Sequence, residues 1–227
     1  MAATGSEALQ PVKTIGDRHP LALTLTALTL VSGFVDAVSY LGLGRVFTAN
    51  MTGNVVILGF AAAGAPGFSA GRSLASLLAF LAGSVCAGRT EAYFRERSRV
   101  HWVRSTLAAE AALQIIATVV AFATDADYAL IVLLALAMGL RNGTVRKLGV
   151  PDMTTTVLTM TLTGIASDSS LAGGTNPRIV RRATAVVAMA VGAFLGAALL
   201  RGPGLAWSLA ASAVLITIAA VAYRERL

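Results

Sequence analysis

Charge is scarce in this sequence. Only 13% of the 227 residues are charged and 56% are hydrophobic, whereas a soluble domain usually has about a quarter of its residues charged. The mean hydropathy is +0.75, and residues 21–35 and 46–71 contain no charge at all. Uncharged apolar runs of ~18 or more residues are typical of membrane-spanning helices. The sequence therefore predicts an integral membrane protein of the all-α class.

Cysteine and histidine are nearly missing too. The single Cys86 excludes an intramolecular disulfide, and its apolar surroundings predict a small packing residue. His19 and His101 lie far apart and lack metal-ligand spacing. Nucleophile-elbow, zinc-protease, phosphate-loop and paired-cysteine motifs are absent as well. We expect no metal, no cofactor and no enzymatic activity.

Three other classes are excluded by pattern. Residues 1–20 are polar and contain Lys13 and Arg18, which argues against a secretory signal and predicts a cytoplasmic N-terminal segment. The apolar runs are continuous, whereas strands of a transmembrane barrel alternate. The net charge of +7 is better explained by basic cytoplasmic loops than by nucleic-acid binding. The lipid bilayer is therefore the expected partner, and nucleic acid is not.

Eight apolar segments make up one transmembrane domain, residues 21–223, with polar loops between them. They are expected at 21–41, 46–64, 73–94, 104–123, 129–147, 153–167, 180–200 and 204–223.

An internal repeat relates residues 21–123 (repeat A) to residues 129–223 (repeat B). Small residues four apart recur 106 or 109 positions later, and such spacing lets helices approach closely in lipid. FTANMTGN at 47–54 falls opposite MTTTVLTM at 153–160. The matched small residues are Thr29, Gly33 and Ala37 with Ala135, Gly139 and Gly143, and Ala79, Gly83 and Ala87 with Ala188, Gly192 and Gly196.

Positive charges favour one topology. If all eight segments crossed the membrane, the best orientation would leave ten of the eighteen Lys and Arg residues inside. If segments 46–64 and 153–167 instead enter and leave by the same face, fifteen lie inside. The positive-inside rule prefers the second arrangement. It predicts six spanning helices and two broken or re-entrant helices, in two inverted repeats with both termini cytoplasmic.

The two polar segments are the candidate site. Transporters with inverted repeats place their sites near the bilayer midplane, where helices are broken. Pro151 and Asp152 also look like a helix start, with Asp152 as N-cap. The alternative is that these side chains are only helix caps and interhelical hydrogen bonds. The candidates are Thr48, Asn50, Thr52, Asn54, Asp152, Thr154, Thr155, Thr156 and Thr159.

The same regions carry a family resemblance. GFVDAVSYLGLGRVFTANMTGN at 33–54 and RNGTVRKLGVPDMTTTVLT at 141–159 resemble the YoaK family of bacterial membrane proteins, a domain-of-unknown-function family. The family pattern covers roughly residues 20–223, and MTLTG at 160–164 departs from the expected glycine position. The resemblance implies a bacterial membrane protein, but it implies no substrate and no catalytic residues.

Charged residues inside apolar segments are further candidates. Asp36 has Asn142 as its repeat counterpart, and the adjacent Arg141 is its expected partner. A carboxylate at that depth costs at least ~2.5–3.5 kcal/mol unless it is paired or hydrated. Asp36 then marks either a proton or solute site or a structural ion pair. Glu110 is expected to pair with Arg104 near the interface.

A transporter of a small solute, with its site between the two polar segments, fits these features best. A channel-like pore on the same plan is the first alternative, and a membrane enzyme or assembly factor acting on lipid is the second. A homodimer through the small-residue faces is compatible with the sequence, unless those faces pack within the chain.

Overall fold

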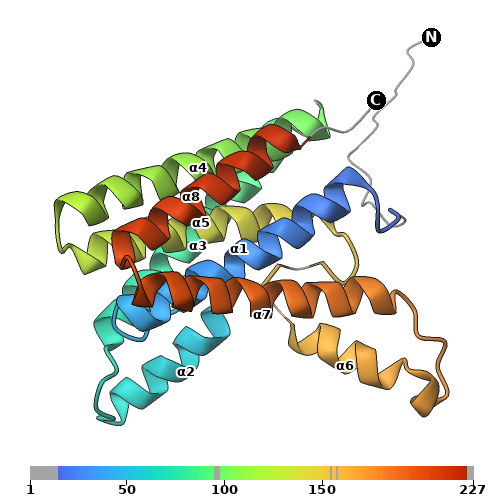
Figure 1. Ribbon diagram of the computed structural model, residues 1–227, viewed down its shortest axis with the longest axis horizontal. Coiled ribbons are helices and arrows are strands. Elements are labelled where there is room, and N and C mark those ends of the chain that lie inside the picture. The colour runs from blue at the N-terminus through green and yellow to red at the C-terminus, as the bar shows by residue number, and fades with distance from the viewer. Residues whose placement is uncertain (1–14, 95–97, 154, 157, 224–227) are drawn as a thin grey trace.

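The computed structural model describes residues 15–94, 98–153, 155–156 and 158–223, and within these it is all-helical. Figure 1 shows the arrangement of its helices. Six are long and apolar enough to cross a membrane, and two are shorter. The long ones are α1 (Pro20–Gly42), α3 (Ala70–Phe94), α4 (Arg99–Ala123), α5 (Asp127–Leu148), α7 (Ile179–Arg201) and α8 (Leu205–Ala222). The short ones are α2 (Met51–Ala62) and α6 (Thr159–Ser167), followed by a 3₁₀ turn, η1 (Ser170–Ala172).

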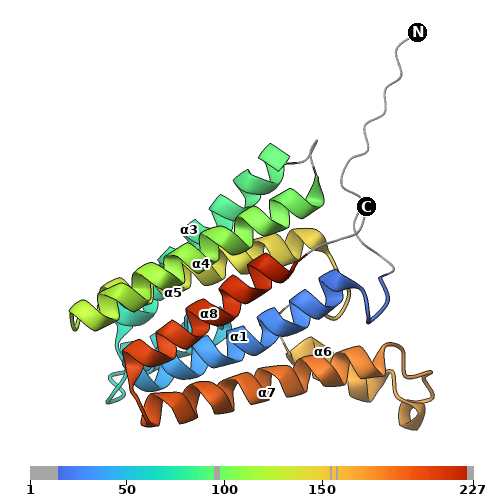
Figure 2. The same ribbon diagram turned by 45° about the horizontal axis from the view of Figure 1, so that its top comes forward.

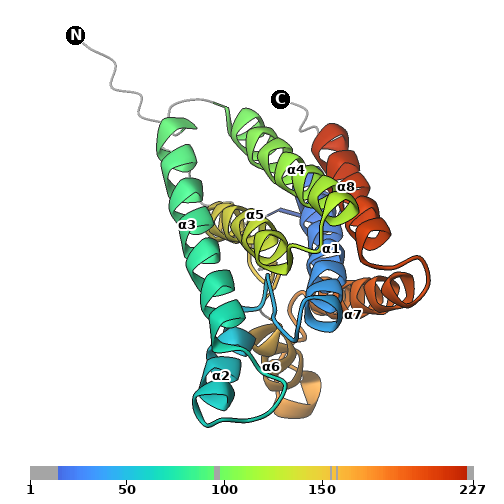
Figure 3. The same ribbon diagram turned by 90° about the vertical axis from the view of Figure 1, so that its left-hand side faces the viewer.

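Helices α1 and α5 form the centre of the bundle. Most of their residues are buried, whereas α3, α4, α7 and α8 turn large apolar side chains outward, as expected for helices that face lipid. Seen end-on, α3, α4, α8 and α7 lie around the two central helices (Figure 3). Cys86 on α3 belongs to this outer surface, so the expectation that it is a packing residue is wrong.

The repeats interlock through their small residues. Helix α1 packs on α7, and the equivalent α5 packs on α3. Gly33 lies directly against the main chain of Met189, and its counterpart Gly139 lies against that of Phe80. In return, Gly192 lies against the main chain of α1 and Gly83 against that of α5. The first helix of each half therefore packs on the third helix of the other, through the faces that the sequence singled out.

Helices α2 and α6 reach only part of the way across. At 1.5 Å per residue they are about 18 Å and 13 Å long, against a hydrocarbon core of about 30 Å. They diverge from a common region beneath the middle of α7 toward opposite ends of the bundle (Figure 1). The Arg182 guanidinium contacts both Asp152, before α6, at 3.2 Å and Asp168, after α6, at 2.7 Å. Arg45, before α2, likewise lies over the ring of Phe68, after α2, at 5.5 Å. Each short helix therefore enters and leaves by the same end of the bundle, in opposite senses in the two repeats.

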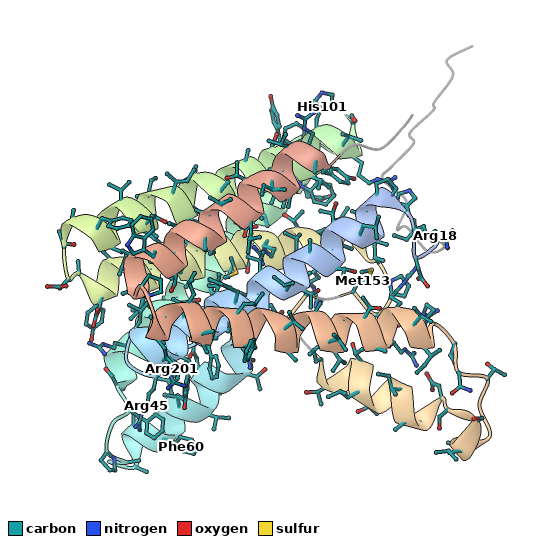
Figure 4. The ribbon with its side chains drawn as sticks, in the orientation of Figure 1. Arg18, Arg45, Phe60, His101, Met153 and Arg201 are labelled. Carbon is teal, nitrogen blue, oxygen red and sulfur yellow. The ribbon has the colours of Figure 1, made fainter. Side chains whose placement is uncertain are left out.

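The basic side chains divide as the charge count predicted. Arg45 and Arg201 lie at one end of the bundle, and Arg18 and His101 lie at the other (Figure 4). Helix α1 begins and α8 ends at this second end (Figure 2). Arg146 and Lys147 lie in the last turn of α5, and Arg178 directly precedes α7, at the same end.

The polar segments are less helical than expected. Segment 46–64 is helical only from Met51, and segment 153–167 only from Thr159. Asp152 has a positive φ of 61° and caps no helix, so the expected helix start at Pro151 and Asp152 is wrong. Three threonines in succession disfavour helix because branched side chains lose rotamer freedom there.

Candidate functional site

The starts of α2 and α6 approach one another at the middle of the bundle. Asn50 is the N-cap residue of α2 but makes no capping hydrogen bond with its side chain. Thr156 lies in the non-helical segment that leads into α6. Both side chains are partly exposed, because they face two cavities that flank this point.

The two cavities are related by the internal repeat. One, of about 520 Å³, lies between α5 and α3, and the other, of about 860 Å³, lies between α1, α7 and the two short helices. Their walls correspond at offsets of 106 and 109 residues. At an offset of 106, the α1 residues of the larger cavity correspond to α5 residues of the smaller one: Asp36, Ala37, Tyr40 and Leu41 to Asn142, Gly143, Arg146 and Lys147. At an offset of 109, the α3 residues of the smaller cavity correspond to α7 residues of the larger one: Phe80, Ser84 and Gly88 to Met189, Ala193 and Ala197.

Three side chains line both cavities: Asn50, Thr52 and Thr156. The smaller cavity extends toward the basic end of α5, at Arg146 and Lys147. The larger one extends toward the opposite end, where Tyr40 lies near the end of α1. The polar trio therefore separates two spaces that reach toward opposite membrane faces.

The Asp36 carboxylate binds the backbone of the segment that precedes α2. Its Oδ1 accepts hydrogen bonds from the main-chain N–H of Thr48 at 3.1 Å and of Ala49 at 2.8 Å. These donors belong to non-helical backbone at membrane depth, where an unsatisfied N–H would be costly. The Thr48 side chain is itself buried and donates to Ser39 Oγ at 3.3 Å. Asp36 also lines the larger cavity, so the same carboxylate binds the backbone and faces the cavity.

Asn142 occupies the equivalent place in repeat B. The Thr156 hydroxyl donates to its Oδ1 at 2.6 Å, and its Nδ2 donates to the Met138 carbonyl at 2.8 Å. A neutral amide therefore stands at α6 where a carboxylate stands at α2. This difference makes the two cavities chemically unequal although their shapes are related.

Asn54 is a structural residue in this arrangement. Its Oδ1 accepts the N–H of Phe47 at 2.9 Å, and its Nδ2 donates to the Phe47 carbonyl at 2.6 Å and to Ser76 Oγ at 3.1 Å. The amide is fully buried and lines neither cavity. It ties the extended approach of α2 to the helix itself and to α3, which fixes where α2 begins.

The threonine-rich segment is divided between the cavity and the interior. Thr159 lines the larger cavity, whereas Thr155 is buried with a positive φ of 59°. Thr154 lies outside the described residues. Asp152 lies at the end of the bundle where α7 begins, and its carboxylate accepts a hydrogen bond from Arg178 Nε at 2.6 Å. Burial alone would raise the pKa of Asp152, but hydrogen bonds and charge from Arg178 and Arg182 outweigh it and hold this pKa below its usual range.

Arg141 does not pair with Asp36. Its guanidinium binds the Glu110 carboxylate, with Nε to Oε2 at 3.0 Å and Nη2 to Oε1 in close contact. Nη1 donates to the Leu28 carbonyl at 2.9 Å and to Ser32 Oγ at 3.0 Å. The expected Asp36–Arg141 pair is therefore wrong, and so is the expected Glu110–Arg104 pair, since Arg104 is exposed.

This ion pair belongs to a buried network across four helices. Gln114 donates to Glu110 at 3.0 Å and accepts from Ser212 of α8. Glu110 and Arg141 are 0% and 1% exposed, and neither lines the two cavities. Because each charge is paired and hydrogen-bonded, the network can fix α1, α4, α5 and α8 in place.

The polar side chains between the two cavities were thus singled out from the sequence, but the residues of the cavity walls were not. Phe80, Met189 and Tyr40 were not anticipated, and neither were Arg146 and Lys147. The 109-residue offset that relates Gly83 to Gly192 also relates Phe80 to Met189. Applying the same offset to the other residues of these two segments would have predicted which α3 and α7 residues line the two cavities.

Comparison with known proteins gives a consistent result. Residues 24–222 match the family described as "Protein of unknown function (DUF1275)". The chain is 35% identical over 148 residues to "UPF0700 transmembrane protein YoaK" of Bacillus subtilis (strain 168). That alignment covers 64% of this chain and 66% of the relative, slightly less than two thirds of its length. No solved structure matches. This multi-pass membrane protein, whose motifs at 33–54 and 141–159 resemble the YoaK family, therefore belongs to the DUF1275 family.

Proposed function

We propose that this protein moves a small polar solute across the bacterial plasma membrane, through the point where α2 and α6 begin. The observation that supports the proposal is the pair of repeat-related cavities with Asn50, Thr52 and Thr156 between them. Inverted repeats with broken helices are a recurrent plan of transporters, with the site at the repeat interface. The function proposed is transport rather than catalysis.

The polarity of the centre suggests the kind of solute. Helix N-termini carry partial positive charge, and α2 and α6 both begin at the centre. Asp36 offsets that charge at α2, whereas the neutral Asn142 leaves it in place at α6. Amide and hydroxyl groups of Asn50, Thr52 and Thr156 can exchange hydrogen bonds with a solute. A small solute rich in hydrogen-bond acceptors fits this centre.

Orientation follows from the distribution of basic residues. Arg146 and Lys147 lie at the mouth of the smaller cavity, at the end of the bundle where Arg18 and His101 also lie. The positive-inside rule places this end in the cytoplasm. The smaller cavity would then face the cytoplasm and the larger one the opposite side.

A flux assay tests the proposal. Protein reconstituted in liposomes would be exposed to osmotic gradients of polyols, amino acids and small organic acids, and the swelling rate would be followed. We expect faster swelling for at least one solute class, and loss of that effect in Asn50→Ala and Thr156→Val. The control Thr26→Val removes a threonine hydroxyl of α1 that bonds only the Ala22 carbonyl at 3.1 Å, and should behave as wild type.

Two results would change the interpretation. Swelling that shows no saturation with concentration would favour a channel-like pore on the same plan. Failure of every solute class, together with no shift in melting temperature of the purified protein in the same panel, would contradict transport, because a ligand that binds the folded state must stabilise it.

A further inference from the structure

The small-residue faces that the sequence offered for a homodimer pack inside the chain instead. Gly33 and Gly192 bring α1 against α7, and Gly83 and Gly139 bring α3 against α5. A Cβ atom added to any of these four glycines would collide with main-chain atoms of the neighbouring helix. Any contact between copies must therefore use another surface.

Helices α2 and α6 present such a surface. Within the described residues α2 packs only on α3, and α6 only on α7 and the following turn η1. Each has a buried inner side and an outer side that nothing covers. The outer side of α2 is Thr52, Val55, Val56, Gly59 and Phe60, and that of α6 is Thr159, Met160, Leu162, Thr163 and Ala166.

Lipid is a poor cover for this surface. Non-helical backbone at membrane depth is tolerated only inside protein or beside a water-filled cavity. Two segments, 43–50 and 149–158, lead into the two short helices, and their described residues are non-helical. The exposed Thr52 and Thr159 lie at the inner ends of α2 and α6, where they line the larger cavity. Lipid that covered this surface would therefore meet polar side chains at the depth of the hydrocarbon core.

The larger cavity is also open on this side. Val56, Phe60 and Leu162 line the cavity and are nonetheless 50%, 46% and 50% exposed. They stand at the rim of an incomplete wall, so the cavity reaches the outer surface between α2 and α6. In a subunit on its own, this polar-centred cavity would therefore open directly to the lipid between α2 and α6.

We propose that a second copy of this chain covers the outer side of α2 and α6 and completes the wall of the larger cavity. Together the outward residues expose on the order of 800 Å² per copy, which is about what each partner contributes to a standard interface. Gly59 and Thr163 on this side are small, which suits close helix contact in lipid. The proposal rests on exposure and membrane depth and holds whether or not the protein transports a solute.

Membrane orientation fixes how the copies meet. Both copies insert with the same end in the cytoplasm, so the two-fold axis that relates them runs along the membrane normal and preserves depth. Because α2 and α6 occupy opposite halves of the bilayer, α2 meets α2 and α6 meets α6. This pairing is specific enough to be tested residue by residue.

Oxidative cross-linking of single cysteines in the native membrane is the test, in a Cys86→Ala background. Val56→Cys and Leu162→Cys should each give covalent dimers. Co-expressed, tagged copies of the two variants should give no cross-link between residue 56 and residue 162. Val119→Cys on α4 is the matched control, since Val119 is 61% exposed on another surface, and it should remain monomeric.

The proposal is overturned if residues 56 and 162 cross-link no faster than residue 119. It is also overturned if the mixed 56–162 cross-link dominates, because that requires antiparallel copies. Capture of lipid in the groove without any dimer would likewise contradict it.

Gly59→Leu gives an independent measurement. A Cβ at Gly59 meets nothing within 4 Å in the subunit, so the larger side chain should leave the fold intact while obstructing the contact. We expect wild-type expression, loss of the 162–162 cross-link and a shift from dimer to monomer in native mass spectrometry. A Gly59→Leu protein that remains fully dimeric and cross-linked at 162 would place the contact elsewhere.

Discussion

The Asp36 carboxylate accepts the main-chain N–H of Ala49 at 2.8 Å, thirteen residues along the chain and on the far side of the turn that ends α1. The bond turns the approach to α2 back into the bundle and supplies an acceptor that lipid cannot. Because the same carboxylate faces the larger cavity, its hydrogen bonds to the backbone and its charge can be tested separately by choosing the replacement.

Asp36→Leu should destabilise the protein, whereas Asp36→Asn should fold. The leucine leaves the N–H groups of Thr48 and Ala49 without their acceptor, at a cost of about 1–3 kcal/mol for each buried unsatisfied group. An asparagine retains an acceptor oxygen, as Asn142 does in repeat B. Melting temperature and monodispersity in detergent would measure this. Equal stability of the two variants would show that the hydrogen bonds from Thr48 and Ala49 to Asp36 do not stabilise the fold.

The same pair of variants tests the charge. If the Asp36 charge takes part in transport, Asp36→Asn should abolish solute-driven swelling at wild-type stability. Wild-type flux in Asp36→Asn would leave the residue with its backbone role alone.

Breaking the Glu110–Arg141 pair should be costly. Glu110→Gln leaves a buried guanidinium without its counter-charge, and removal of one partner of a buried pair typically costs about 3–5 kcal/mol. Adding Arg141→Met should recover much of that loss in a double-mutant cycle on unfolding. The matched cycle of Asp36→Asn with Arg141→Gln should show much weaker coupling, because these side chains share no hydrogen bond and act on one another only through charge at longer range. Coupling in the second cycle and none in the first would reverse this assignment.

Local chemistry made much of this fold predictable. Long uncharged runs identify the six spanning helices, and the positive-inside rule distinguishes them from α2 and α6. The offsets of 106 and 109 residues identify the helix pairs, because close approach in lipid requires small residues on both helices.

The pairing of charges was not predictable in the same way. Arg141 could reach a carboxylate on any neighbouring helix, and its choice of Glu110 depends on how α4 rotates against α5. That rotation is set by the whole bundle and leaves no pattern within either segment. The cavity walls were missed for a related reason, since Phe80 and Met189 resemble ordinary apolar residues until the interlocked repeat places them beside the polar centre.

Glycines at the helix crossings should not tolerate a methyl group. In Gly83→Ala the new Cβ would collide with the Leu136 carbonyl, and in Gly192→Ala with the Leu30 carbonyl. Overpacking of this kind typically costs about 1–3 kcal/mol. Gly88→Ala is the control in the same helix as Gly83, since a Cβ there meets nothing within 4 Å. Thermal unfolding in detergent should rank the two crossing variants well below the control, and equal melting temperatures would contradict close packing.

Acidification should weaken the contact between Asp152 and the start of α7. The pKa of Asp152 is lowered in the folded protein because Arg178 and Arg182 outweigh the effect of burial. Its contribution to stability is therefore complete above its ordinary unfolded pKa of about 3.9 and is lost as pH falls through the lower folded value. The melting-temperature difference between wild type and Asp152→Asn should shrink below about pH 4. A difference that stays constant from pH 7 to pH 3 would contradict this linkage.

Labelling of cysteines by a membrane-impermeant maleimide tests the re-entrant helices directly, in a Cys86→Ala background. The decisive pairs flank each short helix: Arg45 and Ala65 around α2, and Lys147 and Leu171 around α6. A re-entrant helix returns the chain to the face it left, so both members of a pair should label from the same side. The first pair should label from outside intact cells, and the second only after the membrane is permeabilised. His101 and Asp125, at the two ends of α4, provide the reference for a helix that does cross, and should label from opposite sides. If Lys147 and Leu171 also label from opposite sides, α6 crosses the membrane. The two repeats would then no longer be inverted, and the site between α2 and α6 would lose its basis.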